Sequence, residues 1–270
     1  MGPFLKIFGI GSTGSRIVGS MSAKKISSVE YFAADGDPRF AGAGGAFKNI
    51  LLTLNKNADK LAFESAVKGA ELIVIVAALE ETSSAYGVGL VIEAAAAENI
   101  CVYSVFNVSD ENKPFVKKLR ELMYGAVFLN LYSLKSEIAD EIITEAVNTV
   151  VVPATVPSVI NMEKEEIVRV VKGGGLYFGV GTGEINDGDK LLISAKRAIG
   201  LFGPENIVTR TEKMLIWVEG GVNLSLDVTE KLLSFIRGCV KPSAELYFAA
   251  SINDGLSDEV KVSLLASTSS

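Results

Sequence analysis

The sequence predicts an α/β protein in which a parallel sheet, covered by helices on both faces, is followed by a smaller α+β domain. Short apolar runs alternate with segments in which apolar residues recur at helical spacing. Strands that are apolar throughout are typical of parallel sheets, because both faces of such sheets are buried. After Asn161 this strict alternation ends, which predicts a second domain with a different sheet.

The first domain is expected to span residues 1–150. We expect its strands at residues 4–9, 29–33, 72–77, 101–106 and 126–131. We expect its helices at residues 15–22, 58–68, 89–98, 113–123 and 136–150. The last helix carries apolar residues at helical spacing from Ile138 to Val147. It is therefore expected to be a central helix that connects the two domains.

The second domain is expected to span residues 151–270. We expect helices at residues 163–171, 188–199 and 227–238. We expect strands at residues 176–181, 213–219, 245–251 and 260–266. This order predicts a mixed or antiparallel sheet with helices on one side.

Composition limits the classes of protein to consider. The chain has 270 residues, of which 49% are hydrophobic, enough for two modest domains. Its formal net charge of −6 provides no basic stripe, so we expect no nucleic-acid partner. The longest apolar run, residues 72–79, is too short to cross a bilayer, so we expect no membrane insertion. The N-terminus lacks a signal-peptide pattern, and we expect cytoplasmic localisation.

The absence of histidine restricts the chemistry that the chain can perform. Without histidine there is no imidazole base, no zinc-binding imidazole and no Ser-His or Cys-His pair. Cys101 and Cys239 are far apart and lack the spacing of a zinc site, so we predict no metal site built from protein side chains alone. Any chemistry must use carboxylates, hydroxyls or the backbone.

A glycine-rich turn follows the first expected strand and precedes the first expected helix. Glycines let the backbone approach an anion, and the N–H groups of a helix start face that anion. The candidate phosphate-binding residues are Gly9, Gly11, Ser12, Thr13, Gly14 and Ser15. Asp35 follows Gly14 by 21 residues at the end of the second strand, where a dinucleotide-binding fold keeps its ribose-binding acid. A dinucleotide oxidoreductase is therefore one hypothesis.

A second glycine-rich segment, residues 41–46, follows soon afterwards. A dinucleotide fold has no need of it, but a triphosphate site could use Ala43, Gly44 and Gly45. The alternative interpretation is a flexible surface turn.

The loop from Pro153 to Glu166 combines two prolines with a cluster of acids. The prolines predict an extended segment that runs until Asn161 caps a helix starting near Met162. Glu163 and Glu166 are then neighbours in the first turn, where the helix dipole favours carboxylates. One interpretation is structural, an ordinary capped helix start. The other is that the two acids face a metal-bound phosphate and orient an attacking water.

The order of these features resembles FtsZ, the prokaryotic relative of tubulin, across nearly the whole chain. Residues 156–163, V-P-S-V-I-N-M-E, look like the family's P-G-L-I-N-x-D loop. Residues 175–181, G-L-Y-F-G-V-G, resemble its next strand, which ends in G-x-G. Residues 217–226, W-V-E-G-G-V-N-L-S-L, resemble its I-T-G-G-x-D-L-T-L turn. Residues 248–259, F-A-A-S-I-N-D-G-L-S-D-E, resemble F-G-A-x-I-D-x-x-L-x-D-E.

The resemblance implies a tubulin/FtsZ-like fold: a Rossmann-type GTPase domain, a central helix of about residues 136–150, and a smaller α+β activation domain. It implies a cell-division protein that binds GTP or GDP and stacks head to tail, with another copy of itself or a related FtsZ as partner. The acidic loop of one subunit would complete the GTPase site of the next. Asn161, Glu163 and Glu166 would correspond to the family's Asn and two Asp residues. The longer Glu side chains would slow hydrolysis without preventing assembly.

The resemblance also implies a guanine contact in the central helix. Residues 139–141, A-D-E, look like the family's Ala-Asn-Asp segment, so Glu141 would accept hydrogen bonds from the base. A solvated surface acid is the alternative. The given sequence stops at Ser270, just after the last expected strand, and we expect no tail peptide of the family's kind.

The chain departs from the family after the strand at residues 72–77. There the family carries G-G-G-T-G-T-G, whereas residues 80–86 here read E-E-T-S-S-A-Y. A carboxylate about 5 Å from a phosphate, at an effective dielectric of about 20, costs about 3 kcal/mol, or about two decades in affinity. Ser83 and Ser84 could still bind phosphate if Glu80 and Glu81 point away or hold a cation such as Mg²⁺. An ordinary polar loop is the alternative.

Three hypotheses follow. The first is a GTP-binding, filament-forming FtsZ relative with slow hydrolysis. The second is a scaffold or regulator that keeps the fold but binds nucleotide weakly or not at all. The third, the dinucleotide oxidoreductase, depends on the first glycine turn and Asp35 and does not account for the segments after residue 156.

Overall fold

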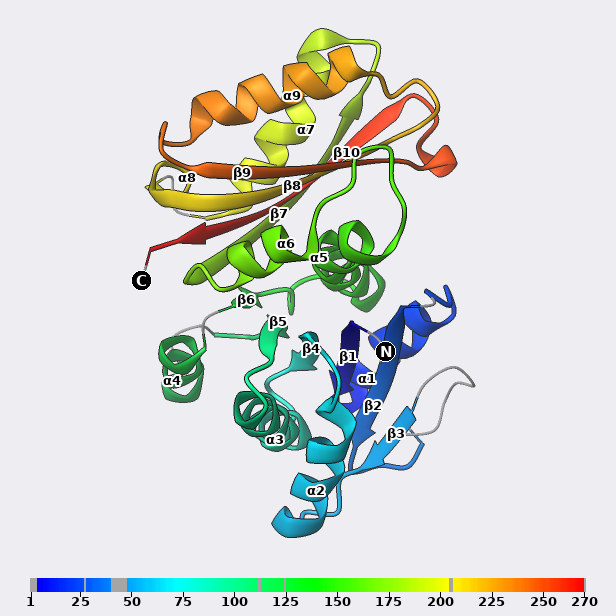
Figure 1. Ribbon diagram of the computed structural model, residues 1–270, viewed down its shortest axis with the longest axis vertical. Helices are drawn as coiled ribbons and strands as arrows, with labels where there is room; N and C mark the ends of the chain where they lie inside the picture. The colour runs from blue at the N-terminus through cyan, green and yellow to red at the C-terminus, as the bar shows by residue number, and fades with distance from the viewer. Residues whose placement is uncertain are drawn as a thin grey trace. The chain divides into compact units, whose positions relative to one another are not determined.

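The computed structural model describes residues 4–26, 28–39, 48–110, 113–123, 125–203 and 206–269. The chain forms two compact units, Met1–Thr144 and Glu145–Ser270, and the elements of both are labelled in Figure 1. The dividing point lies inside the central helix, α5 (Ser136–Thr155). Among the helices of the described ranges, none combines the length and the apolar character that crossing a membrane requires.

The first unit alternates strands and helices, and its sheet is parallel throughout. Its elements before α5 are β1 (Leu5–Ile10), α1 (Gly11–Ser22), β2 (Val29–Asp35), β3 (Lys48–Leu51), α2 (Lys56–Val67), β4 (Leu72–Ala78), α3 (Thr82–Ala97), β5 (Cys101–Asn107), α4 (Pro114–Leu122) and β6 (Ala126–Leu129). The six strands are ordered β3-β2-β1-β4-β5-β6. The order reverses between β1 and β4, and open parallel sheets bind ligands beyond the strand ends at such a point. The parallel α/β fold predicted from the sequence is confirmed.

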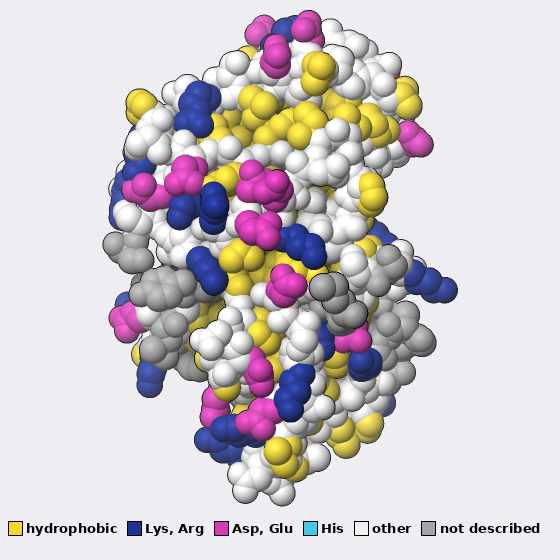
Figure 2. All heavy atoms as spheres, in the orientation of Figure 1, with side chains coloured by type: hydrophobic (Ala, Val, Ile, Leu, Met, Phe, Trp, Pro, Cys, Tyr) yellow, Lys and Arg dark blue, Asp and Glu magenta, His cyan; other side chains and the backbone are white. Residues whose placement is uncertain are grey.

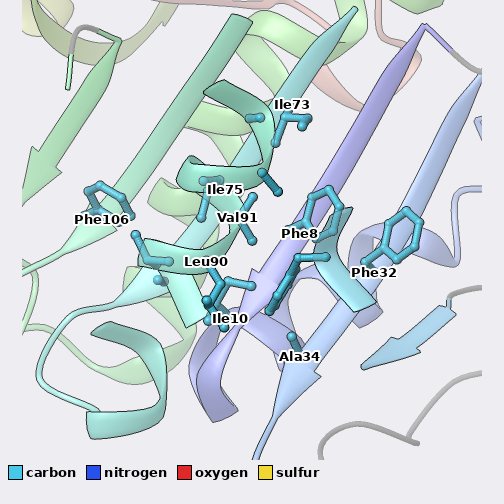
Figure 3. Close-up of a cluster of buried hydrophobic side chains, with 14 of the residues drawn as sticks. Phe8, Ile10, Phe32, Ala34, Ile73, Ile75, Leu90, Val91 and Phe106 are labelled. Atoms are coloured by element: carbon cyan, nitrogen blue, oxygen red, sulfur yellow. The ribbon is translucent and has the colours of Figure 1, made fainter. Parts of the chain in front are cut away.

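One core cluster of the first unit lies between the sheet and the helices α2, α3 and α4. Figure 3 shows Leu90 and Val91 of α3 facing Phe8 and Ile75 of the strands, all of them buried. Side chains alternate between the two faces of a strand, so the neighbours of Phe8 in β1 point to the other face. There Gly9 approaches Gly14 of α1 so closely that a Cβ at position 9 would lie 2.2 Å from the Gly14 oxygen. The glycine turn is thus held directly against the sheet.

Helix α5 is longer than the sequence predicts, and Pro153 lies inside it. The prediction that the chain is extended from Pro153 is wrong, since helix continues to Thr155. Proline in a helix removes one backbone hydrogen bond. Here Pro153 is buried, the Thr155 hydroxyl donates to the Val151 oxygen at 2.6 Å, and the Val156 N–H donates to the Val152 oxygen at 2.9 Å. Burial and these two bonds stabilise the last turn.

The second unit contains a four-stranded sheet of mixed direction. Its elements after α5 are α6 (Lys164–Val171), β7 (Gly175–Glu184), α7 (Gly188–Gly200), α8 (Asn206–Arg210), β8 (Thr211–Gly220), α9 (Leu226–Cys239), β9 (Glu245–Ile252), the 3-10 helix η1 (Asp254–Leu256) and β10 (Glu259–Thr268). The strand order is β7-β10-β8-β9, in which β10 is antiparallel to both neighbours and β8 is parallel to β9. The predicted mixed sheet of a smaller α+β domain is confirmed.

Helices cover both faces of this second sheet, whereas the sequence predicts them on one side. The side chains of Val218, Val262 and Leu264 pack with α7 and α9. The alternating positions face α5 and α6: the Ser263 hydroxyl donates to Glu145 Oε1 at 2.7 Å, and a Cβ added to Gly173, after α6, would touch the Ser267 side chain. Serines at positions such as 263 and 267 suggest a solvent-exposed face, but this face of the sheet is covered by a second layer of helices.

Candidate functional site

The glycine turn lies at the junction of β1 and α1, as the sequence predicts, but α1 begins at Gly11 and not at the predicted Ser15. Gly11 has φ of +76°, in the left-handed region that only glycine adopts without strain. Position 14 has no room for a side chain either, because a Cβ there would lie 2.2 Å from the Val76 backbone oxygen. The turn therefore brings the N-terminus of α1 to the end of β1, where the first N–H groups of the helix have no partner within the helix and can donate to an anion.

The anion at this turn is the side chain of Glu81. Ser12 N–H donates to Glu81 Oε2 at 2.7 Å, and Thr13 N–H donates to Glu81 Oε1 at 3.2 Å. The Thr13 hydroxyl adds a third bond to Oε1 at 2.6 Å. Helix α1 has no side-chain cap from its own N-cap residue, Ile10, and no acid in its first turn. Glu81 thus supplies from a distant part of the chain the negative charge that a helix N-terminus favours.

Of the two serines predicted after β4, Ser83 and Ser84, the one that contacts the turn is Ser84. Its hydroxyl is fully buried and donates to the Ile10 oxygen at 3.1 Å, and it lies 3.4 Å from Glu81 Oε2. Ser83 is half-buried in the same helical turn. The sequence places both in a loop with the helix starting at Gly89, but α3 begins at Thr82. Of the two glycines that obscure this start, Gly87 has a packing role, since a Cβ there would lie 2.6 Å from the Ile10 side chain, whereas a Cβ at Gly89 would meet open space.

Glu80 points away from the turn. Its Oε1 accepts from the Ser109 N–H at 3.0 Å and from the Ser109 hydroxyl at 2.7 Å, and its Oε2 pairs with Lys113. The lysine, followed by the two Ser109 bonds, lowers the pKa of Glu80 to about 2. Of the two adjacent acids, Glu81 is the one whose carboxylate accepts hydrogen bonds from the turn.

Asp35 lies at the end of β2, where the sequence predicts it. It is buried, and its Oδ1 accepts from the Asp37 N–H at 2.7 Å. Burial raises the pKa of Asp35, the bond from Asp37 opposes this, and the charge of Glu81 raises it further. Asp35 and Glu81 are therefore close enough to repel each other beside the glycine turn.

Further polar contacts lie near the turn, and sequence reasoning missed them. Arg16 of α1 pairs with Asp140 of α5, next to Glu141, whose side chain is exposed. Tyr132 lies near both acids. Partial burial of its ring, followed by the charges of Glu80 and Glu81, raises the pKa of Tyr132 to about 12. Nothing in the sequence around Tyr132 or Arg16 signals these partners, because each depends on how distant segments meet. Ala43, Gly44 and Gly45 of the second glycine-rich segment lie outside the described residues.

The acidic loop belongs to the second unit, and its helix start differs from the prediction. Asn161 is not the cap: its Oδ1 accepts from the Ser158 N–H at 2.8 Å. Ile160 pairs with Ala250 of β9 through two backbone bonds of 3.1 and 3.0 Å, which keep the segment extended beyond Met162. Helix α6 therefore begins only at Lys164, with Glu163 as its N-cap.

Glu163 and Glu166 form a capping box at the start of α6. Glu166 Oε2 accepts from the Glu163 N–H at 2.8 Å. Glu163 and Asn161 are exposed and Glu166 is half-buried. With Pro153 and Met162, the Asn161 and Glu163 side chains line a shallow depression of the second unit. The structure thus gives Glu163 the capping role that the sequence predicts for Asn161, places Glu166 in the first turn as predicted, and leaves the side chain of Glu163 exposed.

The donor set fits an anion at the glycine turn, because a carboxylate already binds there. A phosphate would need the same N–H groups, so it fits only if Glu81 moves. Within the described ranges, no three Asp, Glu or Cys side chains gather as metal ligands. Mg²⁺ commonly binds one or two carboxylates together with substrate phosphates, and Asp35 and Glu81 are the acids of the turn that could serve it.

Comparison with known proteins gives related sequences and folds. No family model matches the chain. It is 22% identical over 298 residues to the cell division protein FtsZ of Mycoplasmopsis pulmonis, covering 97% of this chain and 76% of that protein. A mutant FtsZ of M. jannaschii superposes with a TM-score of 0.87 at 16% identity, covering 98% and 91% of the two chains. CetZ2 from Haloferax volcanii, in a GTPγS-bound protofilament, gives 0.72 at 14% identity, covering 99% and 93%.

Proposed function

This chain is an FtsZ/tubulin-family protein, and from that premise we propose that it binds guanine nucleotide and assembles head to tail into a cytoskeletal filament. We place it in the cytoplasm, in cell division, with GTP hydrolysis slow at the interface between successive subunits. Its partner is a second copy of the chain or a related FtsZ. The observation that carries the proposal is the sequence similarity to FtsZ over 97% of the chain.

The first unit supports nucleotide binding. We assign the phosphates to the turn formed by Gly9, Gly11 and Gly14, where N–H groups of α1 point outward, with Ser83, Ser84 and the second glycine-rich segment as further contacts. We assign the ribose to Asp35 and the base to Glu141, on the resemblance. The related CetZ2 binds GTPγS, and Mg²⁺, when bound, would offset the charge of the phosphates. We assign nucleotide binding to the domain of residues 1–150 and activation to residues 151–270.

The second unit supports stacking of copies. Beside the acidic loop lie three exposed apolar side chains: Val159 is 65% exposed, Val222 76% and Ile252 43%. Val159 is next to Ile160, which pairs with Ala250 of β9. In the same strand, Ile252 lies opposite Gly220 of β8, and Val222 comes two residues after Gly220. An apolar group beside exposed acids suits a surface that is covered by another subunit. CetZ2, a relative in fold, forms a protofilament.

Slow hydrolysis follows from the way the acids are held. Glu166 Oε2 accepts the Glu163 N–H, so rotating this carboxylate away from the helix start towards a water would break a cap bond, at a cost of about 1 kcal/mol. Glu163 is exposed, whereas Glu166 is half-buried, and Glu163 is the acid we assign to the water. The side chain of Asn161 is held by the Ser158 N–H, and we propose that it contacts the neighbouring subunit.

A second candidate function is a scaffold that keeps the fold and binds nucleotide weakly or not at all. The occupation of the turn by Glu81 favours it. The family assignment removes the dinucleotide oxidoreductase hypothesis, which never accounted for the second unit. The charge of −6, with acidic and basic side chains intermixed on the face in Figure 2, supports proposing no nucleic-acid partner.

Thermal unfolding in the presence of nucleotides separates the two candidates. We expect GTP or GDP with Mg²⁺ at millimolar concentration to raise the melting temperature, because a ligand that binds only the folded state stabilises it. ATP with Mg²⁺ is the matched control and should have little effect. An unchanged melting temperature with every nucleotide would favour the scaffold.

A further inference from the structure

We propose that Glu81 is an internal ligand of the phosphate turn, which occupies the site of a phosphate group and must leave before a nucleotide can bind. The inference deepens the proposed function by giving the site a built-in competitor. It rests on that function only for the identity of the ligand that replaces Glu81.

The contacts of Glu81 are those of a bound anion. Both carboxylate oxygens accept backbone N–H groups of α1, from Ser12 at 2.7 Å and from Thr13 at 3.2 Å. The carboxylate also lies against the backbone of Gly11, where an added Cβ would come within 2.3 Å of Glu81 Oε2. Two N–H groups at a helix start and a glycine that permits close approach are the features by which proteins bind phosphate.

The direction of the Glu81 side chain is a second, independent observation. Glu81 is the N-cap residue of α3, yet its side chain makes no cap bond to α3. It reaches instead to the start of α1, 69 residues away in sequence. Ser84, in the first turn of α3, lies 3.4 Å from Oε2 and also donates to the Ile10 oxygen, which ties α3 to the end of β1. The shortest hydrogen bonds of the side chain are therefore with the glycine turn and not with its own helix.

Two anions cannot share this turn at low cost. A phosphate placed about 4 Å from a retained Glu81 carboxylate would lose about a thousandfold in affinity at an effective dielectric of about 20. Asp35 lies close enough to repel Glu81 already. Nucleotide binding is thus coupled to rotation of one side chain. Without nucleotide, Glu81 still satisfies the N–H groups of α1, so the turn keeps its conformation.

The test compares Glu81→Gln and Glu81→Ala with Glu80→Gln as the matched control. Glu80 is adjacent in sequence, but its carboxylate binds Ser109 and Lys113 away from the turn. Two quantities are measured for each protein: the Kd of fluorescently labelled GDP by titration, and the melting temperature with inorganic pyrophosphate. Glu81→Gln keeps the shape of the side chain, so it remains informative if Glu81→Ala folds poorly.

We expect both Glu81 variants to bind labelled GDP at least tenfold more tightly than the wild-type protein and the Glu80 variant. We also expect pyrophosphate to raise the melting temperature of Glu81→Ala but not of the wild type, since an added anion replaces the missing carboxylate. Equal affinities in wild type and Glu81 variants would overturn the inference, as would an equal gain in Glu80→Gln. If pyrophosphate stabilises Glu81→Ala while no protein binds GDP, the inference holds and the proposed nucleotide function fails.

Discussion

Glu80 and Glu81 are adjacent in the chain, yet their carboxylates bind different parts of the first unit. Glu80 pairs with Lys113 and accepts from Ser109 after β5, while Glu81 accepts from Ser12 and Thr13 at the start of α1. Both residues lie between β4 and α3, at the reversal point of the sheet. Through these two side chains, the segment after β4 is bonded both to the glycine turn, where a ligand is expected, and to the loop that follows β5.

Glu80 should make the stability of the protein depend on pH in acid. Its pKa is lowered from 4.5 to about 2 in the folded state. A lowered pKa stabilises the folded state above the unfolded value, and that stabilisation is lost as pH falls from 4.5 towards 2. Because the pair is partly exposed, we expect up to about 1 kcal/mol. Urea unfolding of wild type and Glu80→Gln should differ at pH 7 and converge in strong acid. A difference that persists there would contradict this role.

The ion pair of Lys261 with Glu145 and Glu219 should contribute to the stability of the second unit. All three side chains are largely buried. Burial lowers the pKa of Lys261, but the two carboxylates outweigh it and the pKa is raised. Lys261→Met would leave two buried acids without a cation, and we expect a loss of about 3 kcal/mol in the free energy of unfolding. Lys190→Met, which breaks the exposed pair with Glu184, should cost less than about 1 kcal/mol. Similar costs in urea unfolding would contradict the account.

Two glycines of the first unit should respond oppositely to alanine. At Gly11, φ is +76° and a Cβ would collide with Glu81, so we expect Gly11→Ala to destabilise the protein by at least about 1 kcal/mol. At Gly89, in α3, a Cβ meets open space, so Gly89→Ala should stabilise it by about 0.5–1 kcal/mol. Thermal unfolding checks both. A tolerated Gly11→Ala would mean that the turn has a different conformation.

Glu163 allows its structural and proposed catalytic roles to be separated. Glu163→Ala removes both the cap of α6 and the carboxylate. Glu163→Ser keeps a good helix cap but has no carboxylate, so its stability should stay within about 0.5 kcal/mol of the wild type. We expect both variants to lose GTP turnover in phosphate-release assays while still assembling. Normal turnover in Glu163→Ser would assign Glu163 to the cap alone.

Much of the fold could be predicted from the sequence because it depends on local patterns. The apolar strands β1, β4 and β5 and the glycine turn each have a signature within a few residues. The structure differs from the prediction where tertiary contacts determine the ends of helices. Burial of Pro153 allows α5 to continue, and the pairing of Ile160 with Ala250 moves the start of α6 to Lys164.

The candidate site was less predictable than the fold. The types of residue at the turn were recognisable, and repulsion of phosphate by an acid after β4 was expected. Which acid faces the turn was not, because the direction of Glu81 depends on contacts with α1, 69 residues away. The partners of Arg16 and Tyr132 also lie far away in sequence, so no local pattern identifies them.

Sedimentation of the purified chain with GTP and Mg²⁺, with GDP and without nucleotide tests the central claim most directly. We expect the chain to pellet as polymer with GTP, with Glu81→Gln pelleting at lower GTP concentration than the wild type. Failure of both proteins to pellet under every nucleotide condition, at concentrations where they remain folded, would contradict nucleotide-dependent head-to-tail assembly.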